Sequence, residues 1–524
     1  MHPSVSERLA RLAPDQRDAA VAPPGPILCV APAGSGKTTT LVARVAWLIA
    51  SGAAVADEIT AITFNKRAAD ELRERLAGAL APLGGTGGRG DQVRVRTFHA
   101  LGLEILRDSG ATVEPLVDRM SLLRRVAPDA GPVGWRALDT AISRLKLDMG
   151  VDAAAVAADP DAGMIARTFV AYEAALAETG GLDFDDLVAR AVRTLEADAE
   201  LLERWRGRCA HLLVDEAQDL DRAQLRMALL LAAPANRVFF VGDDDQSIYG
   251  WRLADVRRVL SLDASLPGLR RVDLEVNYRC PAPVIERAVR LVEHNRERFA
   301  KRVVARPGAV GRLVLAPDAS DDTVRLERAM AAWPDDDGTQ AVLARTNSGL
   351  LPGVVVCLEL GLEFRSPELP LPLESEELGR LLDKLLNLDD GPLLVQVSSL
   401  GRSELARALL AWAPRYPDRD AFVAAVCERR DRLAALRRDD ANLTLATAHS
   451  TKGLEFDHVV VLADGFPSQR SVAESDEPAR ALEEERRLAY VAWTRARRTL
   501  TLLHDPTAPS LFLEEAFGPT AASP

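Results

Sequence analysis

A short segment near the N-terminus has the composition of a loop that binds phosphate. Residues 31–38 read Ala-Pro-Ala-Gly-Ser-Gly-Lys-Thr, between an apolar run at 26–30 and a helical pattern that continues to about Ile49. This is the spacing of the phosphate-binding P-loop, with Ala31 in place of its first glycine. Backbone amides of such a loop surround phosphate oxygens at the start of the following helix. We expect these amides to belong to Ala33, Gly34, Ser35 and Gly36.

The side chains at the end of this segment predict a magnesium nucleotide. We expect Lys37 to reach the β and γ phosphates and the hydroxyl of Thr38 to ligate Mg²⁺. A second ligand should come from an acidic strand end, and the run LLVDE (212–216) ends in two acids. We expect Asp215 to hold the metal and Glu216 to orient or deprotonate the attacking water. Acidic strand ends are common, so this prediction depends on the P-loop that precedes them.

A third segment, VGDDDQSIYGWR (241–252), carries groups suited to two different ligands. It follows an apolar, strand-like run. Its three aspartates and Gln246 suit a metal or a phosphate. Its rings, Tyr249 and Trp251, suit stacking on a flat base, and Arg252 can add a cation–π or backbone contact. Stacking on a base contributes roughly 1–3 kcal/mol and hardly depends on base identity.

The composition of the whole chain is that of a folded protein of several domains. It has 524 residues, of which 48% are hydrophobic and 27% charged. Chains of this length usually form two to four domains.

The N-terminal sequence lacks a signal-peptide pattern, and no apolar run is long enough to cross a membrane, so we expect a cytoplasmic protein. The five cysteines are scattered, which predicts neither disulfides nor a zinc site. The net charge of −12 argues only weakly against a nucleic-acid partner, because binding depends on local contacts.

The order of apolar runs and helical patterns predicts an α/β fold. Short apolar runs alternate with helices on both sides of two helical stretches, which predicts two parallel sheets with helices on both faces. We expect strands in nine segments: 26–30, 58–64, 211–218, 237–244, 312–316, 340–346, 443–449, 458–464 and 499–504. The stretches near 108–180 and 366–439 are helical and interrupt the two α/β domains.

Taken together, these segments resemble the UvrD/Rep/PcrA family of superfamily 1A DNA helicases. The motifs follow the family's order over nearly the whole chain. They are LAPDQRDAA (12–20), the P-loop, AITFNKRAADELRERL (61–76), VRTFHALGLEIL (95–106), LDFDDL (182–187), LLVDEAQDLDRAQ (212–224), VGDDDQSIYGWR (241–252), LEVNYRCPAPVI (274–285), LATAHSTKGLEFDHVVV (445–461) and EEERRLAYVAWTRARRTL (483–500).

The resemblance implies two RecA-like P-loop domains with parallel sheets, each interrupted by a helical insertion, and ATP with Mg²⁺ bound between them. The implied parts are domain 1A at 1–107 and 182–275, subdomain 1B at 108–181, domain 2A at 276–365 and 440–524, and a reduced subdomain 2B at 366–439.

The resemblance also assigns roles at the nucleotide. Gln16 would read the adenine edge and Tyr278 would stack on the adenine. Gln246 would sense the γ-phosphate and Glu455 would bind the ribose. Arg279 and Arg495 would act as arginine fingers that stabilise the transition state.

A second set of residues would contact single-stranded DNA. Rings on the track would be Phe64, Phe184, Tyr249 and Trp251, with Arg252 beside them. The sugar–phosphate backbone would be held by Thr97, His99, Thr447 and His449. Any one of these aromatic residues taken alone is as well explained by core packing.

The implied activity is that of an ATP-dependent 3′→5′ DNA helicase acting in DNA repair or replication restart. Its partners would be single-stranded DNA, 3′-tailed duplex DNA and repair or replication proteins, in the cytoplasm at the nucleoid.

The chain departs from the family pattern in two places that affect this implied activity. Thr39 stands where close relatives often carry arginine, and the insertion at 366–439 is about half the usual size of subdomain 2B. Two alternatives stay open: a translocase that displaces proteins and unwinds poorly, and a nucleotide-dependent DNA-binding module with a vestigial motor.

Overall fold

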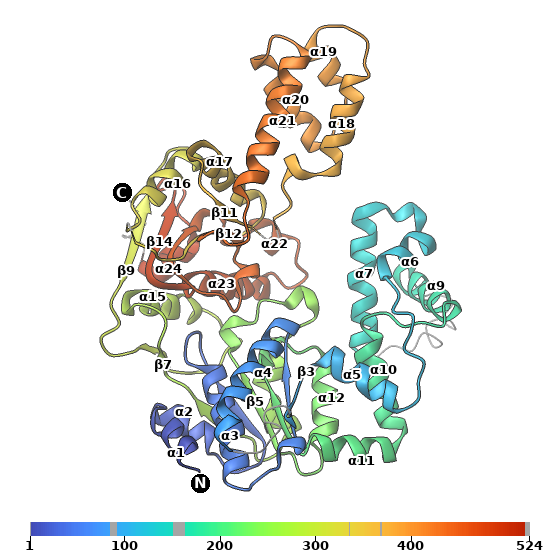
Figure 1. Cartoon of the computed structure of the whole chain (residues 1–524), viewed down its shortest axis with the longest axis vertical. Coiled ribbons are helices and arrows are strands. Elements are labelled where there is room, and N and C mark those ends of the chain that lie inside the picture. Colours follow the sequence, from blue (N-terminus) through green and yellow to red (C-terminus); the bar gives the residue numbers. More distant parts are fainter. Residues whose placement is uncertain (1, 84–91, 150–162, 335, 367–368, 519–524) are drawn as a thin grey trace. The chain divides into compact units, whose positions relative to one another are not determined.

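The computed structural model of the chain describes residues 2–83, 92–149, 163–334, 336–366 and 369–518. The chain forms two compact units (Figure 1). The first comprises Met1–Tyr278 and Asn295–Arg306, and the second comprises Arg279–His294 and Pro307–Pro524. The backbone therefore passes between the units three times.

The first unit is built on a six-stranded sheet in which all neighbouring strands are parallel. The strand order is β3-β2-β4-β5-β1-β6. The strands are β1 (Ile27–Val30), β2 (Ile59–Thr63), β3 (Arg94–Thr97), β4 (His211–Val214), β5 (Val238–Gly242) and β6 (Arg270–Asp273). Strands β1, β2, β4 and β5 coincide with predicted runs, whereas β3 and β6 were not predicted. Both are edge strands whose sequences, RVRT and RRVD, contain no apolar run.

The four inner strands alternate between two hydrophobic cores, because successive side chains of a strand point to opposite faces. Leu28 and Val30 of β1 pack in one core, and Ile27 and Cys29 pack in the other. The second core is covered by α1 (Pro3–Ala10), α2 (Pro14–Ala20), α3 (Lys37–Ala50) and α4 (Lys66–Leu80). The first is covered by α5 (Phe98–Asp108), α10 (Asp186–Ala197), α11 (Ala199–Arg208) and α12 (Arg222–Ala232).

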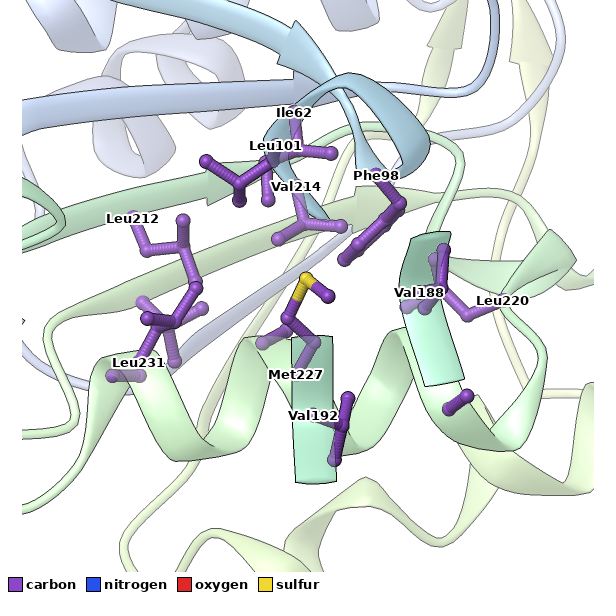
Figure 2. Packing of buried hydrophobic residues seen from close by; sticks show 14 of the residues in the cluster. Ile62, Phe98, Leu101, Val188, Val192, Leu212, Val214, Leu220, Met227 and Leu231 are labelled. Carbon is purple, nitrogen blue, oxygen red and sulfur yellow. The ribbon is translucent and has the colours of Figure 1, made fainter. Parts of the chain in front are cut away.

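Figure 2 shows the first of these cores at close range. Met227 and Leu231 of α12 point toward the sheet, where they meet Leu212 and Val214 of β4. Phe98 and Leu101 of α5 and Val188 and Val192 of α10 complete the packing. This core fixes the strand ends from which the predicted site residues project.

A helical insertion interrupts the first unit, as the Ala-rich pattern predicts. It contains α6 (Arg119–Val126), α7 (Gly131–Leu147) and α9 (Met164–Glu178), which share a small hydrophobic core of their own. Residues 150–162, which belong to the predicted subdomain 1B, lie outside the described residues.

The second unit also contains a parallel six-stranded sheet, in the order β11-β12-β10-β13-β14-β9. Its strands are β9 (Arg312–Pro317), β10 (Gln340–Ala344), β11 (Phe364–Arg365), β12 (Leu443–Thr447), β13 (Phe456–Leu462) and β14 (Ala496–His504). Helices α15 (Ala282–Val292), α23 (Pro478–Trp493) and α24 (Leu511–Phe517) pack together, and α16 (Asp322–Ala331) packs with α17 (Leu351–Leu360). The predicted α/β class with parallel sheets is thus confirmed in both units.

Four further helices interrupt the second unit and surround a separate core: α18 (Glu376–Leu386), α19 (Leu393–Ser398), α20 (Glu404–Trp412) and α21 (Arg419–Leu436). Figure 1 shows them as a bundle in orange. Its correspondence to a reduced subdomain 2B stays a prediction. Among the helices that the structure describes, none combines the length and apolar character needed to span a bilayer.

Candidate active site

The P-loop connects β1 to α3, and its backbone depends on the glycine that begins the helix. Gly36 adopts the left-handed conformation with φ of +85°. A Cβ atom at this position would lie 2.6 Å from Nε2 of Gln16, so glycine is required both for the backbone and for this close approach. Gln16 donates through Nε2 to the carbonyl of Ser35 at 2.8 Å. The structure therefore places this predicted adenine-reading residue against the P-loop.

Three more hydrogen bonds fix the first half of the P-loop. The Ala33 amide donates to Oδ2 of Asp243 at 3.0 Å. The Asn277 side chain donates through Nδ2 to the Ala33 carbonyl at 2.5 Å. The Tyr278 amide donates to the Gly34 carbonyl at 2.8 Å. These contacts hold the loop in one shape, as a preorganised anion site requires.

Lys37 and Glu216, predicted to act on the same phosphate group, lie close together. Nζ of Lys37 is 3.6 Å from Oε1 of Glu216, and their side chains are 15% and 22% exposed. Glu216 occupies the left-handed region with φ of +52°, an unfavourable conformation for a residue other than glycine. Gln218 donates to its Oε2 at 2.6 Å. Strain of this kind is typical of functional sites, where surrounding contacts fix the residue.

The residues predicted to hold Mg²⁺ fit that role by their donor atoms. Thr38 is the second residue of α3 and Asp215 directly follows β4, so both supply oxygen ligands. Mg²⁺ usually takes one or two protein ligands and completes its shell with phosphate oxygens and water.

Ser35 Oγ is a buried hydroxyl that has no hydrogen-bond partner within the described chain, and a phosphate oxygen could accept a hydrogen bond from it. When bound, the metal would neutralise charge on the phosphates. No cluster of three or more His, Cys, Asp or Glu side chains suited to a metal occurs in the described residues.

A pocket of about 450 Å³ opens beside the P-loop in the first unit. The predicted adenine-binding residues Gln16 and Tyr278 both line it. The remaining lining residues come from α1, the connection to α2, the P-loop and the first turn of α3: Ser4, Glu7, Arg8, Arg11, Leu12, Ala13, Gly36 and Thr39. The residues of α1 were not predicted as part of the site, because a short amphipathic helix carries no chemical motif. Thr39, noted as a departure from the family, is part of this lining.

The aromatic residues of the loop at 241–252 form one stacked group with the residue that follows β2. The rings of Phe64 and Tyr249 are parallel, with centroids 5.1 Å apart and an interplanar angle of 6°. Trp251 meets Tyr249 edge-on at 6.2 Å. The guanidinium of Arg252 lies over both rings, 4.5 Å from the Trp251 centroid and 5.5 Å from that of Tyr249. Trp251 is 56% exposed, so its ring is available to a base.

A second pair of predicted DNA contacts lies nearby in the same unit. The rings of His99 and Phe184 stack with centroids 3.9 Å apart. Burial lowers the pKa of His99 to about 4, against the attraction of Asp185, so the imidazole is neutral at pH 7. A contact from His99 to DNA would therefore be a neutral hydrogen bond and not an ion pair. Thr97 accepts from the Ala100 amide and so caps α5.

The predicted DNA residues and the predicted catalytic residues of the first unit share one small pocket. Its lining includes Phe64, His99, Asp215 and Glu216. The residues predicted to contact DNA and those predicted to act at the phosphate are therefore neighbours in this unit.

The predicted residues of the second unit form their own contacts. Arg279 donates to Glu455 at 2.7 Å and to the Thr494 carbonyl at 3.2 Å. Burial disfavours the ionised Glu455, but Arg279, with Arg497 and Arg495, outweighs burial and lowers the pKa of that carboxyl. Arg495 is 1% exposed and donates to the carbonyls of Val491 and Leu454 at 2.8 and 3.0 Å. The roles of both arginines as fingers, and of Glu455 at the ribose, stay predictions.

The second unit also carries two predicted DNA-backbone residues at the end of β12. Thr447 shares a hydrogen bond with Ser450 at 3.2 Å between their hydroxyl oxygens. His449 begins a 3-10 turn (His449–Thr451). Burial and the nearby Arg345 lower the pKa of His449 to about 4, so this imidazole is also neutral at pH 7. Their contacts to DNA stay predictions.

Comparison with known proteins matches both units. The model of the UvrD/REP helicase N-terminal domain matches residues 12–267, and that of the UvrD-like helicase C-terminal domain matches residues 428–505. "ATP-dependent DNA helicase PcrA" of Staphylococcus aureus is 33% identical over 301 residues, which are 55% of this chain and 40% of that protein. "ATP-dependent DNA helicase UvrD1" of Mycobacterium tuberculosis is 34% identical over 346 residues, which are 61% of this chain and 44% of that protein. The matched segment thus spans less than half the length of these relatives.

Proposed function

Because this chain belongs to the UvrD-like helicase family, we propose that it is an ATP-dependent motor that moves 3′→5′ along single-stranded DNA and separates 3′-tailed duplexes. The relatives named above are ATP-dependent DNA helicases, which supports this activity. We place its work in DNA repair or replication restart, with ATP and Mg²⁺ as fuel and metal.

One observation carries the proposal: a single loop connects the residues predicted to act at the nucleotide to the rings predicted to stack on bases. Asp243 accepts from the P-loop amide of Ala33 and, at 2.7 Å, from Nε2 of Gln246. Three residues further on, Tyr249 stacks on Phe64. A shift of Gln246 when ATP is hydrolysed would therefore move the rings that grip the bases. This is the physical requirement for a motor, because nucleotide state must bias the grip on the track.

The small helical insertion of the second unit favours a second candidate, a translocase that displaces proteins from single strands. The described helices α18–α21 form a compact bundle with one core. If an insertion of this size separates strands poorly, movement and unwinding would be uncoupled. The close Lys37–Glu216 pair supports an active motor over a vestigial one, because ATP hydrolysis would use both groups near one phosphate.

Two assays with the same protein separate these functions. The first measures strand separation on 3′-tailed, 5′-tailed and blunt duplexes with ATP and Mg²⁺. The second measures displacement of streptavidin from a 5′-biotinylated single strand. A 3′→5′ helicase gives separation of the 3′-tailed duplex alone and displaces streptavidin. A translocase displaces streptavidin with little strand separation. Preference for the 5′-tailed duplex would contradict the proposed polarity.

A further inference from the structure

The three aspartates of the loop at 241–252 are buried around one lysine. Lys301 and the side chains of Asp243, Asp244 and Asp245 are each at most 1% exposed. Nζ of Lys301 lies 3.0 Å from Asp243 and 2.9 Å from Asp245, and it also pairs with Asp244. Arg298 donates to Asp245 at 2.8 and 3.1 Å. Lys301 is one of only six lysines in the chain, and no motif of the sequence drew attention to it.

Lys301 comes from a segment with an unusual place in the chain. Asn295–Arg306 belongs to the first unit, although the residues on both sides of it belong to the second. It is anchored to the loop by the Lys301 and Arg298 ion pairs and by the Phe299 amide, which donates to Asp244 at 2.8 Å. Its strand β8 (Val304–Ala305) also pairs with β7 (Val276–Asn277), the last strand before the chain first enters the second unit.

Asp243 connects this segment to the nucleotide loop through its two oxygens. Oδ1 meets Lys301, and Oδ2 accepts from the Ala33 amide and from Nε2 of Gln246. The other two aspartates have different partners: Asp245 pairs with Arg298 and Lys301, and Asp244 with Lys301 and the Phe299 amide. Asp243 thus accepts hydrogen bonds both from the P-loop and from Gln246, the predicted γ-phosphate sensor.

The charge balance explains why the ammonium matters. A carboxylate removed from water is stable only when it is paired and its lone pairs accept hydrogen bonds. Without Lys301, Arg298 would still pair with the triad, but through Asp245 and not through Asp243. Asp243 would then lose the ammonium partner of its Oδ1, and a shift of this carboxylate moves the oxygen that accepts from Ala33 and Gln246.

We propose that Lys301 is a positioning residue for ATP hydrolysis, which acts through Asp243 to fix the Ala33 amide and the Gln246 side chain and joins both to Asn295–Arg306. This proposal rests on the proposed function. Small displacements of groups that orient a reacting phosphate lower the rate steeply, by up to about a hundredfold for a shift on the order of 1 Å. The effect should therefore appear in kcat of folded enzyme and not only in stability.

The test compares two isosteric variants of neighbouring aspartates in the full chain. Asp243→Asn and Asp244→Asn remove the same charge beside the same lysine, but the second leaves the bonds to Ala33 and Gln246 intact. We expect Asp243→Asn to lower kcat with saturating single-stranded DNA by roughly tenfold to a hundredfold, and Asp244→Asn to stay within about threefold of the wild type. Lys301→Met should lower kcat as much as Asp243→Asn does. The double variant of Asp243→Asn and Lys301→Met should have a kcat little below that of either single variant, because both changes break the same connection. Lys301→Arg should recover part of the loss.

The outcomes separate the possible failures. An equal loss of kcat in Asp243→Asn and Asp244→Asn would show that the triad merely stabilises the fold. Fully additive losses of kcat in the double variant of Asp243→Asn and Lys301→Met would also overturn the proposal. If Lys301→Met does not fold, judged by its melting curve, the two aspartate variants decide alone. Arg302→Ala, next to Lys301 but 73% exposed, is the surface control. A wild type that hydrolyses no ATP with DNA present overturns the proposed function, and this inference with it.

Discussion

Glu216→Gln is expected to lower kcat for ATP hydrolysis by about 10²–10⁴, the usual contribution of a general base. Glutamine has nearly the same shape and keeps an oxygen for the bond from Gln218, but it cannot accept a proton from water. It also loses the attraction to Lys37. Binding of ATP should persist, because the P-loop bonds do not involve Glu216. The measurement is steady-state turnover with saturating single-stranded DNA, together with the Kd of a nonhydrolysable ATP analogue.

A surface glutamate provides the control for this variant. Glu203 of α11 is 66% exposed and pairs with the neighbouring Arg206. Glu203→Gln should leave turnover unchanged. If Glu216→Gln hydrolyses ATP at the wild-type rate, the assignment of the base is wrong, whatever the behaviour of Glu203→Gln.

Asp183→Ala should destabilise the first unit by up to about 3–5 kcal/mol, because it removes the buried carboxylate that Arg119 and Lys146 share. Asp185 still pairs with Arg119, and Asp186 still pairs with Lys146. Asp183 is 1% exposed, and its Oδ2 accepts from Arg119, Lys146 and the hydroxyl of Tyr172 at 2.8, 2.8 and 2.7 Å. The cluster joins the helical insertion to the segment that carries Phe184. The free energy of unfolding by denaturant at pH 7 measures the loss. Asp139→Ala is the matched control, since it removes a 44% exposed carboxylate from the same Arg119 and should cost less than about 1 kcal/mol.

The same carboxylate gives a pH signature. Burial disfavours the charged Asp183, but Lys146 and Arg119 outweigh it and lower its pKa to about 2. A carboxyl group whose pKa is lower in the folded state stabilises the folded protein at pH values above its unfolded pKa, which is near 4. This stabilisation is lost as the pH falls through the folded pKa. The difference in stability between wild type and Asp183→Ala should therefore shrink between about pH 4 and pH 2. Equal destabilisation by Asp183→Ala and Asp139→Ala at pH 7 would contradict this account.

The sequence predicted those strands of the first unit that are buried on both faces. β1, β2, β4 and β5 consist of four or five fully buried residues each, so their apolar runs are visible without any structure. The edge strands β3 and β6 carry exposed or half-buried arginines, and their strand character comes from pairing with a neighbour. Such pairing is a property of the assembled sheet and leaves no local pattern.

The site was predictable where its residues lie in motifs and not where it depends on long-range contacts. Lys37 was assigned to the β and γ phosphates from the P-loop, and Glu216 to the attacking water from the acidic strand end. Their side chains lie 3.6 Å apart. The stack of Phe64 on Tyr249 joins residues that were predicted separately as DNA contacts. Lys301 lies 58 positions from Asp243 in the sequence and has no motif around it, so its burial against three aspartates could not be inferred. The family roles of the individual residues stay predictions.

The most direct measurement is the rate of ATP hydrolysis by the full chain with and without single-stranded DNA such as poly(dT). The central claim is that one loop transmits the state of the bases to the groups that act on ATP. It predicts turnover that is slow alone and rises severalfold or more as poly(dT) saturates the protein. Turnover that is the same at every concentration of poly(dT) would contradict the claim.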